Sequence, residues 1–218
     1  AGLTNRTFHA GEDFRHLLSG IRYMLDAMEL LDLQAGDRLG HGTAMGIRPG
    51  LWIERMPQSI SISRGDWMLS VLAGWRLLRG SSSNSIIVQK LRDELDKTVS
   101  DVFGEDIATD DFEKAMALRD LSVQEVHRFM AGEVERGDDV IVSDFCREEA
   151  RRVANTFRDN RPALELFWRW QSDKSVWQKS EELVSKDAAF LDESAYVELQ
   201  RALMQLVKKR DVVVETLP

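Results

Sequence analysis

The chain has almost no cysteine and no long apolar run, and each of these absences argues against a class of protein. One cysteine occurs among 218 residues, so Cys146 cannot form a disulfide within the chain, and we expect a reducing, cytoplasmic location. No apolar stretch approaches the roughly 20 residues that span a bilayer. Residues 1–20 also lack the pattern of a signal peptide. A secreted disulfide scaffold and a membrane protein are therefore not expected.

Basic residues are also in the minority. Lys and Arg number 29 against 37 Asp and Glu, which gives a formal charge of −8. General nucleic-acid binders carry a net basic field, so this charge argues against that class. The cluster Lys208–Arg210 is short and suits the C-terminus of a helix. With 43% apolar and 30% charged residues, the composition is that of a globular protein with a core.

The N-terminal part has the pattern of a strand, a helix and a second strand. Residues 6–9 are predicted to end a strand, and Asp13 is a suitable N-cap for a helix. Apolar residues recur at helical spacing over 14–33, which predicts an amphipathic helix closed by Gly36. A second strand is predicted over 38–43. This order indicates a βαβ unit.

Helical periodicity dominates the stretch from residue 44 to residue 211. All six tryptophans lie there and are expected to fill a helical core, with an exposed binding groove as the alternative. Asp211–Pro218 is rich in β-branched residues and is predicted to be a buried strand. Strands are thus expected only near the two ends. The predicted helices are 65–79, 86–103, 110–131, 144–159, 162–186 and 192–209, with breaks at 80–85, 104–106 and 137–139.

Two of the four histidines and one carboxylate share a predicted edge. His9 and His41 stand where successive strands end, and Glu12 follows His9 by three residues. Because the C-terminal ends of parallel strands form the active face of α/β folds, these residues predict a divalent-metal site. A purely structural role for each histidine stays open. His16 either supports this site or has an ordinary surface or packing role. His127 is predicted to be structural or solvated.

The two segments around these residues resemble the adenosine deaminase family of metal-dependent hydrolases. His9–Glu12 reads His-Ala-Gly-Glu, and Arg38–Thr43 reads Arg-Leu-Gly-His-Gly-Thr. In that family these motifs end the fifth and sixth strands of a (β/α)8 barrel. Residues 212–218 resemble the strand that follows, with Leu217 where the family often has cysteine.

The resemblance implies a fold and a division of the chain. Residues 1–48 would be a barrel segment, 49–210 a helical insertion with its own core, and 211–218 a returning barrel strand. The fold class expected is therefore mainly α by residue count, with an α/β fragment of a (β/α)8 barrel. The chain would be an internal fragment, and the remainder of the barrel would be its partner.

The resemblance also implies roles for the three residues. His9 would be a ligand of Zn²⁺, Glu12 would protonate the purine ring nitrogen, and His41 would orient the zinc-bound water and take its proton. The reaction would be hydrolytic deamination of a purine nucleoside, adenosine giving inosine. Adenine or a nucleotide is the nearest alternative substrate.

The sequence departs from the family in ways that matter. It contains no His-x-His pair, and Asp110-Asp111 and Asp138-Asp139 lie among predicted helices rather than after a strand. Two further histidine ligands and an aspartate are therefore expected outside this chain, which alone would be inactive. The alternative function is a helical oligomerisation or partner-docking module inserted in a deaminase-like host, with a homo-oligomer formed through the insertion.

Overall fold

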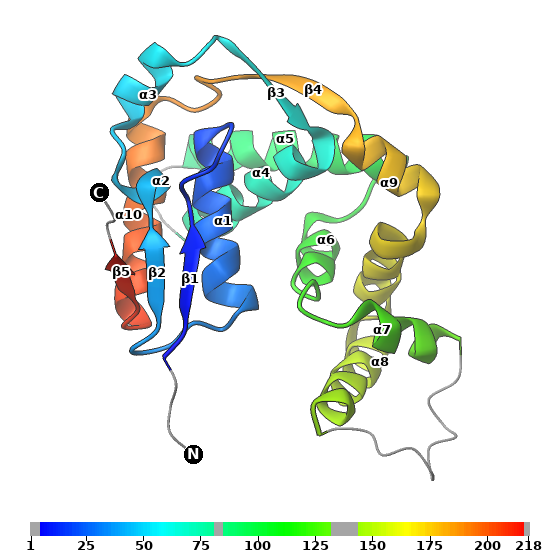
Figure 1. The fold of residues 1–218 in the computed structure, drawn as a ribbon. Helices are drawn as coiled ribbons and strands as arrows, with labels where there is room; N and C mark the ends of the chain where they lie inside the picture. The colour runs from blue at the N-terminus through cyan, green and yellow to red at the C-terminus, as the bar shows by residue number, and fades with distance from the viewer. Residues whose placement is uncertain (1–4, 81–84, 132–143, 216–218) are drawn as a thin grey trace.

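The structure, a computed structural model, describes residues 5–80, 85–131 and 144–215 and is mainly helical (Figure 1). A small sheet with α1 and α10 lies at one side of the molecule, and α6, α7 and α8 lie at the other. Within the described ranges, no helix combines the length and the apolar composition needed to cross a bilayer. Three predicted features lie wholly or partly outside the described residues. They are 81–84 of the break at 80–85, the break at 137–139, and 216–218 of the last strand.

Three parallel strands form the sheet that carries both histidine motifs. The strands are β1 (Thr7–Ala10), β2 (Arg38–His41) and β5 (Val213–Glu215), in the order β1-β2-β5. Helix α1 (Leu17–Leu30) joins β1 to β2 and packs against β1, which confirms the βαβ unit. Helix α10 (Glu193–Lys209) precedes β5 and packs against α1.

Helix α1 is shorter than the sequence predicted. It begins at Leu17 rather than at Phe14, and its N-cap is His16, whose Nδ1 accepts from the Leu18 N–H at 3.2 Å. Its C-cap is Leu31, so Gly36, with a φ of +89°, belongs to the turn before β2. The Asp13 cap was wrong because the fully buried His16 ring is fixed by tertiary packing, which sequence pattern does not report.

The two faces of the sheet differ in burial. Ala10 and Leu39 are buried on the face that meets the helices, whereas Thr7, His9 and Arg38 are exposed on the other face. The C-terminal strand was predicted to be buried, but among its described residues 213–215 form the strand and Val213 is 51% exposed. The reason is that no described helix covers the face on which Val213 lies.

The helical block contains a second, unpredicted sheet. Strands β3 (Ser59–Ser63) and β4 (Leu183–Asp187) pair antiparallel, so strands are not confined to the chain ends. Ile60 and Ile62 are buried between exposed or half-buried serines, which is the period of two of a half-buried strand. The remaining helices are α2 (Thr43–Gly46), α3 (Pro49–Arg55), α4 (Arg64–Leu78), α5 (Ser85–Phe103), α6 (Thr109–Met116), α7 (Val123–Met130), α8 (Asp144–Ser172) and α9 (Lys174–Glu181).

Two predicted helices are divided differently in the structure. The segment 110–131 forms α6 and α7, separated by a turn that buries Leu118 and Leu121. The segment 162–186 contains the end of α8, then α9, and then β4. Helix α8 continues past residues 160–161, where the sequence predicted a break between two helices, and it is kinked at Asn160. The kink arises because Pro162 has no N–H to donate to the helical hydrogen bonds. Asp173 begins α9 by accepting from the Val176 N–H at 3.4 Å.

The helical block shares one continuous core with the strand–helix–strand segment and does not form a core of its own. Helix α4 packs against α1, α5 and α10, so it is the element that joins the two parts. Among the tryptophans, Trp52, Trp67 and Trp75 are buried in this core, as the sequence predicted. Trp177 is 59% exposed and is not a core residue, whereas Trp168 and Trp170 are partly buried.

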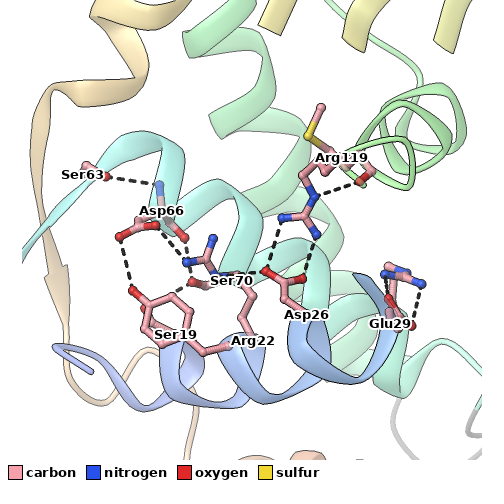
Figure 2. Close-up of polar contacts among 11 residues, drawn as sticks. Ser19, Arg22, Asp26, Glu29, Ser63, Asp66, Ser70 and Arg119 are labelled. Atoms are coloured by element: carbon pink, nitrogen blue, oxygen red, sulfur yellow. Dashed lines mark hydrogen bonds and ion pairs between the residues drawn. The ribbon is translucent and has the colours of Figure 1, made fainter. Parts of the chain in front are cut away.

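A network of ion pairs also connects α1 to α4 and to the residues after α6 (Figure 2). The Arg22 side chain of α1 is only 8% exposed and bonds Asp66 of α4 at 2.9 Å. Asp26, one turn further along α1, accepts from Arg119 at 2.7 Å. Arg119 lies just after α6 and also donates to the Met116 carbonyl at 2.8 Å. The network therefore links α1 to both α4 and the turn between α6 and α7.

Candidate metal-binding site

The candidate site is formed where β1 and β2 end side by side. The parallel register pairs His9 with Gly40 and Ala10 with His41, so the two motifs meet at one edge of the sheet. Glu12 follows in the loop between β1 and α1. The structure thus brings together the three residues that the sequence singled out.

The ligand atoms of His9, Glu12 and His41 all lie within 4.8 Å of one another. The two imidazole rings meet edge to face, with centroids 4.9 Å apart and an interplanar angle of 77°. His9 is exposed, whereas Glu12 and His41 are half-buried. Glu12 Oε2 is shielded from solvent and has no hydrogen-bond partner among the described residues. Because an unpaired buried polar atom is costly, this oxygen is available to accept a hydrogen bond or to bind a cation.

Glycine on the neighbouring strand makes room for the His9 ring. A Cβ on Gly40 would come within 2.4 Å of His9 Cδ2 and 2.9 Å of His9 Nε2. Gly11 has a φ of +84°, and a Cβ there would meet the Met24 side chain at 2.7 Å. These two positions require glycine for different reasons, one for the ligand ring and the other for the turn that carries Glu12.

The turn after β2 holds His41 in an uncommon conformation. His41 has a φ of +68°, and Gly42 follows with a φ of +58°. The Gly42 N–H donates to the Ala10 carbonyl at 3.2 Å, and the Ala44 N–H donates to the Gly11 carbonyl at 2.8 Å. These bonds tie the His41 turn to the loop that bears Glu12. A non-glycine residue at positive φ persists only where its surroundings enforce that conformation.

His16 is not part of the ligand cluster. Its ring is fully buried against Trp52 and Trp67, and its Nε2 bonds the Asp187 carbonyl at 3.1 Å. Burial lowers its pKa from 6.5 to about 4. Since Nδ1 accepts from Leu18, the neutral ring carries its proton on Nε2. His16 is therefore a structural cap that ties the start of α1 to the residue that ends β4.

The other sequence candidates lie elsewhere. Asp110 and Asp111 occupy the first turn of α6 and do not join the ligand cluster. His127 lies in α7 beside Trp168, with ring centroids 5.3 Å apart, and its side chain is exposed. Lys208 and Lys209 form the last turn of α10, as predicted. Asp138-Asp139 and the Cys146 side chain lie outside the described residues.

A cavity of about 400 Å³ runs beside the cluster along the outer edge of β1. Its walls are mainly apolar and come from β1 and α1. Phe8 and Leu31 in these walls are 43% and 38% exposed, which is high for large apolar side chains. The residues that line the cavity are Phe8, His9, Ala10, Gly11, Glu12, Asp13, Tyr23, Asp26, Ala27, Leu30 and Leu31.

The cluster has the donor chemistry of a zinc site. Two imidazoles and one carboxylate form a ligand set that catalytic zinc centres use, with a fourth position left for water. Tetrahedral ligands at about 2.1 Å from zinc are about 3.4 Å apart, so spacings up to 4.8 Å need only small side-chain rotations. The residues therefore fit the metal, and the exposed His9 ring is free to make such a rotation.

Sequence reasoning missed Gln200, which holds the turn behind His41. It lies on α10 among the buried residues Tyr196, Leu199 and Leu203. A single amide on an otherwise apolar helix face was a readable signal of a specific polar contact.

Comparisons of this chain with protein-family models and with curated proteins find no match.

Proposed function

We propose that this chain is part of a zinc-dependent aminohydrolase of the adenosine deaminase type, acting on a purine nucleoside. The observation that carries the proposal is the convergence of His9, Glu12 and His41 within 4.8 Å at the ends of two adjacent parallel strands. Each residue lies in one of the two motifs that resemble that family. The order of the motifs, strand then helix then strand, is the order expected in the barrel.

The open sheet supports a larger barrel. Parallel sheets occur almost only where both faces are covered, yet His9 and Arg38 lie on a face that no described helix covers. Strand β1 pairs only with β2 among the described strands, so its outer edge is free for a further parallel strand. The remainder of the barrel would supply this strand and the missing metal ligands.

The apolar cavity beside β1 is the place for the helix of that additional strand. It follows the free edge of β1 and the side of α1 that carries Tyr23, Ala27 and Leu30. A purine ring would instead approach the exposed face that carries His9. We therefore assign the apolar part of the cavity, along α1, to barrel assembly, and the part lined by His9 and Glu12 to substrate.

In the complete barrel, with its other metal ligands in place, the three residues would have distinct tasks. In the isolated chain, which lacks those ligands, all three are close enough to share one metal ion. His9 would hold the metal, which when bound supplies the Lewis acidity that makes water a nucleophile near neutral pH. His41 would orient the attacking water and accept its proton, a task suited to imidazole. Glu12 would donate a proton to the purine ring nitrogen as the amino-bearing carbon is attacked.

Metal titration of the 218-residue chain tests the proposal. We expect one weak Zn²⁺ site by calorimetry, lost in His9→Ala and kept in the control His127→Ala, since His127 lies in α7 away from the cluster. The isolated chain should release no ammonia from adenosine. Absence of any Zn²⁺ binding by the wild-type chain would contradict the metal site, and deamination by the chain alone would contradict the incomplete barrel.

The helical block also supports the alternative of a docking module. Ile86, Trp177 and Leu183 are large apolar residues that are 84%, 59% and 68% exposed on this block. Light scattering distinguishes the alternatives, because a docking module that forms homo-oligomers should show a mass that rises with concentration. A strict monomer at high concentration argues against self-assembly through the block.

A further inference from the structure

The side chain of Gln200 reaches from α10 to the turn that follows His41. Its Nε2 donates to the Ala44 carbonyl at 2.9 Å and to the Ile47 carbonyl at 2.8 Å. Gln200 is 5% exposed, so these two bonds are largely sheltered from water. Both acceptors belong to the one-turn helix α2 and its C-cap. The last carbonyls of a helix have no partner within it, and Gln200 satisfies two groups at this end.

The turn that Gln200 holds is the one that sets the conformation of His41. Helix α2 begins two residues after His41, and the N–H of Ala44 is bonded to Gly11 in the loop of Glu12. His41 is one of three non-glycine residues at positive φ in the described ranges, and the other two are Asp32 and Asp211. Histidine and aspartate occur there more often than most residues, but the conformation still costs an L-residue about 1 kcal/mol or more. The His41 conformation therefore depends on the bonds that fix its turn.

Gln200 supplies this support from a distant part of the sequence. It is separated from Ala44 by 156 positions, and it lies on the last helix of the helical block. Helix α10 packs on α1, α2 and α3, so the amide reaches the turn from a helix held by several contacts. A group that fixes the turn next to a functional side chain restricts where that side chain can lie.

We propose that Gln200 is a positioning residue that fixes the His41 turn and so places the His41 imidazole against His9 and Glu12. The role of His41 at a metal rests on the proposed function. The contacts between Gln200 and the His41 turn do not depend on it. The helical block would then be a working part of the site and more than a docking appendage.

The test compares Gln200→Met with Gln205→Met in the 218-residue chain. Methionine keeps the length and packing of glutamine but removes both donors, and Gln205 offers the same change at an exposed position of α10. Co²⁺ is the probe, followed by its visible absorption. We expect about tenfold weaker Co²⁺ binding in Gln200→Met and no change in Gln205→Met. The backbone NMR resonances of His41 and Gly42 should also shift only in Gln200→Met.

The outcomes separate positioning from packing. If Gln200→Met lowers the unfolding midpoint but leaves the His41 resonances and the Co²⁺ affinity unchanged, Gln200 only packs and the proposal is overturned. If the wild-type chain binds no Co²⁺, the proposed function fails, whereas the His41 resonances still test the positioning role.

A measurement on the wild-type chain decides the question should Gln200→Met fail to fold. The side-chain amide protons of Gln200 should exchange slowly with solvent and show nuclear Overhauser contacts to Ala44 and Ile47. Fast exchange of these protons, with no such contacts, would overturn the proposal.

Discussion

The imidazole of His9 lies across the backbone of Gly40 on the neighbouring strand. A Cβ at position 40 would fall 2.4 Å from His9 Cδ2, closer than any real contact allows. The ring therefore uses the space that a side chain would fill, and Gly40 is required by its neighbour rather than by its own backbone angle. The position of the candidate metal ligand is thus set by a pair of residues that face each other across the sheet.

Replacement of Gly40 should affect metal binding more than stability. In Gly40→Ala we expect the exposed His9 ring to rotate away, with Co²⁺ binding weakened by about tenfold or more. The unfolding free energy should change by less than about 1 kcal/mol, because the displaced ring is flexible and exposed. Gly46→Ala is the matched control, since no atom lies within 4 Å of a Cβ there. Equal Co²⁺ affinities in the two variants would contradict the view that the missing side chain at Gly40 positions the His9 ring.

The positive φ of His41 predicts an inverted order of stability at that position. Both His41→Ala and His41→Gly should lose Co²⁺ binding. Because an L-residue pays a steric cost in the left-handed region and glycine does not, the Gly variant should be more stable than the Ala variant by about 1 kcal/mol. In ordinary strand or helix positions the order is the reverse. Urea unfolding of the two variants measures the difference, and a more stable Ala variant would contradict the strained turn.

The buried His16 predicts a loss of stability in mild acid. Burial lowers the pKa of His16 to about 4, so between pH 6.5 and pH 4 the unfolded chain binds more protons than the folded chain. The free energy of unfolding should therefore decrease as the pH is lowered from 6.5 to 4, and His16 should account for up to about 3 kcal/mol of that decrease.

His16→Asn is the control for that effect, because asparagine also serves as an N-cap but does not titrate there. Its stability at pH 7 should be lower, since the aromatic contacts are lost, and its slope against pH between 6.5 and 4 should be smaller. Equal slopes in the two proteins would rule out His16 as the source.

The ion pairs along α1 predict a large difference between two chemically identical changes. Asp26→Asn should destabilise the chain by about 2 kcal/mol, because Arg22 is nearly buried and Arg119 loses its bidentate partner. Asp159→Asn removes an exposed pair with Arg158 and should leave the unfolding midpoint unchanged. Urea unfolding at low and high salt checks both, and similar midpoints for the two variants would contradict the role of the network.

The local elements near the site were predictable because their signals are local. Strand 7–10 was expected from a short apolar segment before Gly11, and strand 38–41 from its place after a helix and a short loop. Helices α1, α4, α5 and α10 follow from apolar residues at helical spacing. Strand β4 was missed because its residues continue a helical pattern, and only pairing with β3 makes them extended. The cap of α1 was misplaced because a buried ring, rather than the nearest aspartate, fills that position.

The sequence by itself determined the chemistry at the strand ends, since His9, Glu12 and His41 stand beside glycines where two short predicted strands end. Only the tertiary structure decided that these groups meet, because their approach depends on the parallel register of β1 and β2, on the missing side chain at Gly40 and on an amide from α10. Strand register and long-range hydrogen bonds join residues that are far apart in the chain. A local pattern of residues does not encode which distant residues come into contact.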